Sequence, residues 1–398
     1  MDFTFSPEQE ALKQQFTEYF TQKEKEAPEG WFTAKIDYCY EHDEAWEFHR
    51  KIGKELGEKG WLSLPWPEEY GGKGFGQLEQ MIFQEARAYH RIPGFDPGPV
   101  VAAAGVLEKG TEEQKQKWLP LIASGESTWC EGWSEPNSGS DLASITATTG
   151  VLDGDDWVIN GQKVWTTGAH RCSHMILMAR TDPDAPKHKG ITYFLTPMDR
   201  PGIEVRPILR MYRGHSFNEV FFDDFRVPKE NIISEANMGW YVLMAGMDFE
   251  RTGVAFVAET WRDFDDLIEF IKENGFDGRS PAEQAIVRHK LAQCQIELEI
   301  WRQWAYYVAW LQGKKTVKTT GEASAVKRVA SEMMLKVSQV GLEVLGMYGP
   351  LQGNSKWARL HGAFEYSCQH DLGMTIAGGT TEVQKNLIAW MELGLPRK

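Results

Sequence analysis

Two glycines stand directly before a run of threonines near the end of the sequence, in the segment MTIAGGTTEVQKN at residues 374–386. Paired glycines let a backbone take positive φ or approach a ligand closely. The threonines offer hydroxyls at the expected start of a helix, which is a suitable place for an anion. The segment therefore predicts a binding turn, although the glycines themselves carry no side chain able to do chemistry.

Two further segments carry residues suited to a flat, anionic cofactor. WSEPNSGSD, residues 133–141, is a run of small polar residues after an expected strand, and its N–H groups and hydroxyls could cradle a pyrophosphate or a flavin edge. In GQKVWTTG, Trp165 and Thr167 provide an aromatic face and a hydroxyl. Taken alone, the first segment is equally consistent with a solvated loop, and the second with a core tryptophan in a hairpin.

Composition restricts the class of protein. The chain has 398 residues, 42% of them hydrophobic, and its net charge of −14 argues against nucleic-acid binding. Its five isolated cysteines suggest neither a disulfide framework nor a zinc site, and they fit a reducing, cytoplasmic setting. The N-terminus is acidic where a targeting segment would be basic, so we expect no targeting segment. The sequence has no long apolar run, so we expect no membrane span.

Helical patterns occupy both ends of the chain. FSPEQEALKQQFTEYF has the signature of a helix start, with Ser6 as cap and Gln9 completing a capping box. Similar spacing predicts an N-terminal helical domain over residues 1–127. Helical patterns of bundle length return over residues 236–398.

Strand patterns fill the middle of the chain. DDWVINGQKVWTTG contains two β-rich runs around Asn160-Gly161, which predicts a hairpin turning at that dipeptide. Further alternating segments follow, and residues 128–235 read as an antiparallel β domain.

Six segments, in this order and spacing, resemble those of the acyl-CoA dehydrogenase family. They are GWLSLPWPEEYGG, SEPNSGSDL, VINGQKVWTTGA, VFFDDFRVPKENII, NMGW and IAGGTTEVQKNLIAWMELGLPR. The resemblance implies a mainly α fold with a central β domain: an N-terminal helical domain, an antiparallel β domain and a C-terminal four-helix bundle. It also implies FAD between the β domain and the bundle, and a tetrameric assembly.

The family motifs assign roles to residues by position. Flavin-binding roles fall on seven residues: Ser134, Gly139, Ser140, Trp165, Thr167, Thr380 and Glu382. Ser134 and Thr167 would hydrogen-bond the isoalloxazine edge, where electron density arrives with the hydride. The ribityl–pyrophosphate region would meet Thr380 and Glu382. Substrate contacts would come from Ser140, Arg251 and Gly379.

The catalytic base lies at different positions in two branches of the family. In the commonest branch a glutamate precedes the Gly-Thr pair, and here that position is Gly378, whose N–H could still donate to the thioester carbonyl. The isovaleryl type keeps its base on the first bundle helix before an arginine, where GMDFERTGVAF has Glu250 before Arg251. Without the resemblance, that pair reads as a solvated helix start. Because Gly378 cannot take a proton, we expect Glu250 to be the base, with Asp248 as the next candidate.

Two departures from the family bear on assembly. In homotetramers a neighbouring subunit covers the adenine half of FAD with an Arg-x-x-Phe-Gly turn and a Gln-x-x-Gly-Gly segment. Here NGFDGRSPAEQ lacks that turn, and EVLGMYGP has Glu343 for the glutamine and Met347 for the second glycine. A carboxylate repels a pyrophosphate, and methionine fills the space that glycine leaves. The sequence therefore predicts a homotetramer or an α2β2 heterotetramer with a sister subunit, as in some bacterial relatives that act on steroid side chains.

The expected function is FAD-dependent α,β-dehydrogenation of an acyl-CoA to a trans-2-enoyl-CoA, with electrons passed to an electron-transferring flavoprotein. By the family resemblance, the base position suits a branched, cyclic or otherwise bulky acyl group, and the small residues from Pro97 to Gly105 are compatible with a wide pocket. The alternatives are a flavin-dependent oxidase or monooxygenase, a non-catalytic partner subunit and a nucleic-acid-binding relative. Glu250 argues against the partner subunit, and the charge argues against nucleic acid. No metal is expected.

Overall fold

A computed structural model describes residues 4–31, 36–250, 253–275, 279, 281–314 and 319–397, without the side chains of residues 36, 246–250, 281 and 282. The chain divides into two compact units and alternates between them. The helical unit comprises Met1–Lys35, Gly76–Ile92 and Arg251–Lys398, and the sheet unit comprises Ile36–Phe75 and Pro93–Glu250.

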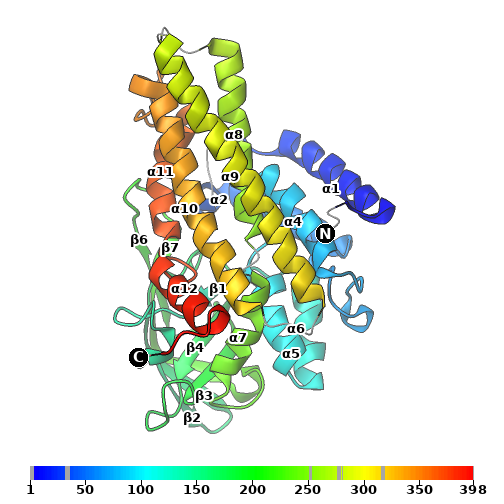
Figure 1. Ribbon diagram of the computed structural model, residues 1–398. Helices are drawn as coiled ribbons and strands as arrows, with labels where there is room; N and C mark the ends of the chain where they lie inside the picture. The colour runs from blue at the N-terminus through cyan, green and yellow to red at the C-terminus, as the bar shows by residue number, and fades with distance from the viewer. Residues whose placement is uncertain are drawn as a thin grey trace. The chain divides into compact units, whose positions relative to one another are not determined.

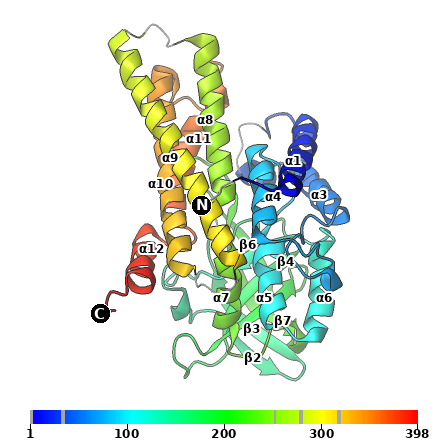
Figure 2. The same ribbon diagram turned by 45° about the vertical axis from the view of Figure 1, so that its right-hand side comes forward.

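The helical unit contains long helices, of which α8 to α11 lie side by side as a bundle (Figures 1 and 2). Its main helices are α1 (Pro7–Glu26), α4 (Gln77–Tyr89), α8 (Val254–Asn274), α9 (Pro281–Gly313), α10 (Thr320–Leu345), α11 (Ala363–Met374) and α12 (Thr381–Leu387). Its short helical turns are η6 (Gly346–Tyr348), η7 (Arg359–Gly362) and η8 (Ile388–Glu392). None of the helices, over the residues that the structure describes, is long and apolar enough to cross a membrane.

The predicted start of the first helix is confirmed. Ser6 caps α1 by accepting a hydrogen bond from Gln9 N at 3.2 Å, and the Gln9 side chain accepts from Ser6 N at 3.0 Å. This reciprocal pair satisfies two N–H groups that a helix start leaves open.

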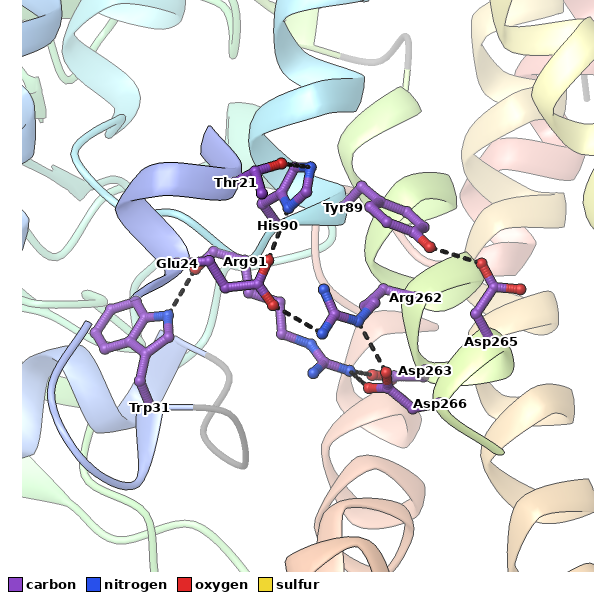
Figure 3. Close-up of polar contacts among 10 residues, drawn as sticks. All are labelled: Thr21, Glu24, Trp31, Tyr89, His90, Arg91, Arg262, Asp263, Asp265 and Asp266. Carbon is purple, nitrogen blue, oxygen red and sulfur yellow. Dashed lines mark hydrogen bonds and ion pairs between the residues drawn. The ribbon is translucent and has the colours of Figure 1, made fainter. Parts of the chain in front are cut away.

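Charged side chains connect α1 and the end of α4 to α8 (Figure 3). The Glu24 carboxylate contacts His90 Nδ1 and Arg262 Nη2, each at 2.8 Å. Arg91 Nη2 donates to Asp263 at 2.5 Å. These groups are largely withdrawn from water, so the pairs are screened less than surface pairs.

The sheet unit combines helices with a seven-stranded sheet. Its helices are α2 (Ile36–Glu41), α3 (Asp43–Glu58), α5 (Ala103–Lys109), α6 (Glu112–Ala123) and α7 (Gly239–Glu250), with the short turns η2 (Glu68–Tyr70), η3 (Gly98–Ala102), η4 (Leu142–Ser144) and η5 (Lys229–Asn231). Its strands are β1 (Trp129–Gly132), β2 (Thr149–Asp153), β3 (Asp156–Lys163), β4 (His174–Arg180), β5 (Ile191–Pro197), β6 (Ile203–Ile208) and β7 (Phe217–Pro228).

The strand order is β1-β4-β2-β3-β7-β6, with β5 also paired to β4. Most pairs are antiparallel, as expected for the β domain, but β1 runs parallel to β4, and β2 meets β4 in one parallel pair. A parallel pair needs a crossover connection. Here the chain between β1 and β4 supplies it by passing through β2 and β3.

The predicted hairpin at Asn160-Gly161 is wrong. Both residues lie inside β3, and the turn between β2 and β3 falls earlier, at Gly154, whose φ is 64°. The pairing of β3 with β7 shifts register between Ile159 and Gly161, so the dipeptide marks a β-bulge instead. Asn160 secures the bulge by exchanging hydrogen bonds of 2.8 and 3.0 Å with Asp224 of β7.

The small residues near Pro97 serve close packing within the sheet unit. Four residues of this stretch belong to a buried cluster with Trp129, Tyr193 and Val242; they are Val101, Ala102, Ala103 and Val106. A Cβ at Gly98 would lie 2.4 Å from Trp129, and one at Gly105 would lie 2.9 Å from Val242. Their size therefore follows from contacts inside this unit, and it is no argument for a wide substrate pocket.

Candidate active site

The expected flavin loop follows β1 in the sheet unit. Ser134 is half-buried, and its carbonyl accepts a hydrogen bond from Val164 N at 2.9 Å. Gly139 and Ser140 are exposed, and a Cβ added at Gly139 would lie 3.7 Å from Ser134 Oγ. The loop therefore brings these three expected cofactor residues together with an open face.

Trp165 lies on the segment that follows β3. Its backbone is left-handed, with φ of 63°, and the residue is 55% exposed. Its indole makes an edge contact with Phe217, at 5.7 Å between ring centroids. An indole this exposed does not belong to the core of the sheet unit. The neighbouring Thr166 exchanges hydrogen bonds with Asn218 of β7, which fixes the segment from Trp165 to the half-buried Thr167.

The double-glycine turn belongs to the helical unit. Gly378 and Gly379 both have left-handed backbones, with φ of 63° and 91°. Thr380 caps α12 by accepting a hydrogen bond from Val383 N at 3.2 Å, and Glu382 is exposed in the first turn of that helix. Thr380 also accounts in part for the lowered pKa of Glu382, after its own backbone N–H. The positive φ anticipated for the glycines is therefore present.

The side chains of Lys327 and Gln384 hold this turn through hydrogen bonds to its backbone carbonyls. Lys327 Nζ donates to Gly379 O at 2.7 Å and to Met374 O at 3.1 Å. Gln384, which is fully buried, donates from Nε2 to Gly378 O and Gly379 O at 3.1 and 3.3 Å. Sequence reasoning missed both residues: Lys327 lies far from the turn in the sequence, and Gln384 lies inside the quoted segment but was given no role. A lysine in a helix made mostly of small and apolar residues was the available signal.

The expected base is the last residue of a helix in the sheet unit. Glu250 ends α7, which packs against α5 and β5. The side chains of Glu250 and Asp248, and all of Arg251, lie outside the described residues. The chain resumes with Gly253, which precedes α8 in a left-handed conformation with φ of 69°.

The two residues that depart from the family in the adenine-covering segment lie at the end of α10. The Glu343 carboxylate pairs with the Lys290 ammonium of α9, and Arg279 Nη2 donates to the carbonyls of Glu343 and Val344 at 2.6 Å each. Met347 is 90% exposed. The carbonyls of Glu343 and Val344 and the Glu343 carboxylate thus have partners within the same chain. The Met347 side chain, just after the helix, is open to solvent.

A buried ion pair behind the flavin loop was also missed. Glu135 and Lys163 both stand inside the quoted motifs, and both side chains are at most 2% exposed. Lys163 follows the inward positions Trp157 and Ile159 of β3 at strand spacing, and a lysine in such a position signals a buried partner.

The side chains present fit FAD. A flavin needs a flat apolar wall and hydrogen-bonding groups near its polar edge and phosphates. In the sheet unit, Trp165 offers an exposed aromatic face and the serines of the flavin loop offer hydroxyls. In the helical unit, taken by itself, the capped turn at Thr380 offers a helix start. Beside that turn, Thr381 Oγ1 and Gln384 Oε1 are buried and make no hydrogen bond to the described part of the chain. Over the same part, no group of three or more His, Cys, Asp or Glu residues is arranged to hold a metal ion.

Comparison with known proteins matches these features to one enzyme class. Models of the N-terminal, middle and C-terminal domains of acyl-CoA dehydrogenases match residues 6–126, 130–225 and 237–391. The chain therefore belongs to the acyl-CoA dehydrogenase family, with its fold, its FAD cofactor and its oxidoreductase chemistry.

Individual members of the family are similar to this chain over most or all of its length. The chain is 34% identical to the acyl-CoA dehydrogenase IpdE1 of Mycobacterium tuberculosis over 89% of its length and 90% of that protein. It is 32% identical to FadE26 of the same organism, over 100% and 99% of the two chains. Among solved structures, a chain of the Tcur3481–Tcur3483 steroid acyl-CoA dehydrogenase superposes with a TM-score of 0.89 at 30% identity, and one of the M. tuberculosis ChsE4–ChsE5 complex with 0.87 at 30%, each covering 100% of both chains.

Proposed function

We propose that the protein oxidises a bulky acyl-CoA thioester to its trans-2-enoyl-CoA, with Glu250 as the base. The observation that carries the proposal is the left-handed glycine at position 378. It leaves no carboxyl group where the commonest branch of the family has its base, whereas a glutamate ends α7.

The chain's residues divide the work as follows. The Glu250 carboxylate removes the α-proton of the thioester, and Arg251, Ser140 and Gly379 help to hold the substrate. The N–H of Gly378 donates to the thioester carbonyl, where negative charge grows as the proton leaves. FAD held by these residues would supply the acceptor for the β-hydride. Trp165 shields the cofactor, Ser134 and Thr167 hydrogen-bond its edge, and Gly139, Thr380 and Glu382 complete its binding site.

The acyl group is proposed to be branched, cyclic or steroid-like. Support comes from the base position and from the steroid acyl-CoA dehydrogenase whose chain superposes on this one. The reduced cofactor is proposed to pass its electrons to an electron-transferring flavoprotein. Use of O₂, as in an oxidase or monooxygenase, is the alternative, and it would release H₂O₂ or yield a hydroxylated product.

The assembly is proposed to be an α2β2 heterotetramer with a sister chain. Glu343 and the exposed Met347 support this, as does the likeness to chains of two-component complexes. We further propose a division into domains at residues 1–127, 128–235 and 236–398, supported by the three matched segments. A cytoplasmic location is also proposed, supported by five unpaired cysteines.

A panel of thioesters tests the proposal. Turnover of short linear, branched, cyclic and steroid acyl-CoAs is measured with a dye acceptor, with and without oxygen. Preference for ring-bearing or branched thioesters and little H₂O₂ are expected. Preference for short linear thioesters would refute the substrate assignment, and stoichiometric H₂O₂ would refute the dehydrogenase assignment.

A further inference from the structure

The flavin loop is attached to the end of β3 at three consecutive residues. The carbonyl of Trp133 accepts from Lys163 Nζ at 3.0 Å, and the carbonyl of Ser134 accepts from Val164 N at 2.9 Å. The Glu135 carboxylate accepts from the same Lys163 ammonium at 2.9 Å. One lysine therefore contacts the residues on both sides of Ser134.

The Glu135 side chain is fully satisfied in this position. Besides Lys163, its two oxygens accept from the backbone N–H groups of Thr146, Ala147 and Thr148, each at 2.8 Å. Burial by itself would raise the pKa of Glu135, but the charge of Lys163 and these N–H groups lower it overall. Burial lowers the pKa of Lys163 to about 8, which leaves it protonated at neutral pH. The two groups are therefore both charged where there is little water, and each depends on the other.

The same strand end leads into the second flavin segment. Val164 follows Lys163 and precedes Trp165, whose backbone is left-handed, and Asn218 holds the next residue, Thr166. The pair thus lies between the loop that carries Ser134 and the segment that carries Trp165 and Thr167. A shift of Lys163 would move one segment relative to the other.

Resting on the flavin roles proposed above, we infer that Glu135 and Lys163 are positioning residues: together they set Ser134 relative to Trp165 and Thr167, and so shape the flavin site. Neither contacts the reacting atoms. A pair of this kind preorganises binding groups, so that the cofactor does not have to order them.

The test separates positioning from folding. Glu135→Gln and Lys163→Met are made singly and together, in the same assembly as the wild-type chain. Either single change leaves an unpaired buried charge and lowers the melting temperature. The double variant leaves no such charge, so its melting temperature should lie above those of both single variants. It still gives the Trp133 carbonyl no donor, and FAD affinity should fall by about tenfold to a hundredfold.

The readouts are the FAD dissociation constant, the visible circular dichroism of the bound flavin and its midpoint potential. Lys187→Met is the matched control, since Lys187 pairs with Asp141 of the same loop at 2.7 Å but is 61% exposed, and it should change none of them. A stable double variant with wild-type affinity, dichroism and potential would overturn the inference. Loss of FAD only in proportion to the loss of stability, across all variants, would overturn it as well. No thioester is used, so failure of the proposed reaction leaves a separate signature in the substrate panel.

Discussion

The Lys327 ammonium donates to the carbonyl oxygen of Gly379 at 2.7 Å, and the Gln384 side-chain amide donates to the same oxygen at 3.3 Å. A backbone turn with two left-handed residues would otherwise be free to change shape. The turn at Gly378 is therefore set by the surrounding side chains, and its chemistry can be probed by substitution without dismantling it.

Adding a carboxylate to that turn should narrow the substrate range. At Gly378 a Cβ would lie 3.7 Å from Lys327, which is an ordinary contact, and the left-handed backbone costs an L residue about 1–2 kcal/mol. Gly378→Glu should therefore fold and bind FAD but lose activity on bulky thioesters. Gly378→Ala, with the same strain and no carboxyl group, is the control. Wild-type activity and substrate range in both variants would place Gly378 away from the acyl chain.

Replacing the proposed base should stop turnover and leave the cofactor in place. Glu250→Gln keeps the shape of the side chain but cannot accept the α-proton, and loss of a general base typically costs about 10²–10⁴-fold. The rate of flavin reduction in a single turnover is the measurement, with Asp248→Asn as the control. If Glu250→Gln retains its rate and Asp248→Asn loses it, the base is Asp248.

Trp165→Ala should weaken FAD binding and alter the flavin absorbance. Trp165 is 55% exposed, so its indole offers a face to stack on, and aromatic contacts are worth about 0.5–1.5 kcal/mol beyond area burial. Trp310, a tryptophan of α9 that is 39% exposed, gives the matched control Trp310→Ala. Equal flavin retention and equal spectra for the two variants would remove Trp165 from the site.

The lone chain should bind less than one FAD per subunit. A neighbour carrying Glu343 presents a carboxylate to phosphate, although Lys290 offsets part of its charge. Co-expression with a sister chain should give one FAD per pair of chains. Light scattering and the flavin-to-protein ratio measure both. Glu343→Gln with Met347→Gly should raise the ratio in the lone chain, whereas Glu332→Gln, elsewhere on α10, should not. A homotetramer of the wild-type chain saturated with FAD contradicts the proposal.

Acid should loosen the contact between α1 and α8. Burial acts to raise the pKa of Glu24, but hydrogen bonds from His90 and Arg262 lower it from 4.5 to about 2. A lowered carboxyl pKa adds stability above pH 4.5, and this is lost as the pH falls toward 2. Glu24→Gln should lower the melting temperature at pH 6 and make it less dependent on pH below 4.5. Glu18→Gln, an exposed site on the same helix, should behave as wild type; identical pH profiles for all three proteins would show that the ion pairs contribute nothing.

The sequence predicted local structure well where the signal is local. The capping box of Ser6 and Gln9 is one such case, since its groups lie within one turn. The Asn160-Gly161 hairpin failed because the same dipeptide suits a bulge. Which of the two forms depends on whether the flanking runs pair with each other, and here both pair with β7.

In the candidate site, too, features with a local sequence signal could be predicted, whereas those that depend on distant contacts could not. The expected flavin segments are placed so that Ser134 and Gly139 meet and Trp165 is exposed. The buried pair Glu135 and Lys163 was missed, although Lys163 continues the inward positions of β3. Charged residues are usually exposed, and the partner of a buried lysine is set by distant parts of the chain.

The alternation of the chain between its two units has a consequence for synthesis on the ribosome. Residues 77–89 form α4 and emerge early, but the helices α8 and α9 that α4 packs against begin only at Val254. Arg91 and its partner Asp263 are separated by 172 residues. Chains with such distant contacts fold slowly, because a large loop must close before the contact is gained. The apolar side of α4 that contacts α8 and α9 therefore stays exposed while most of the protein is still being made, and it is a natural site for chaperone binding during translation.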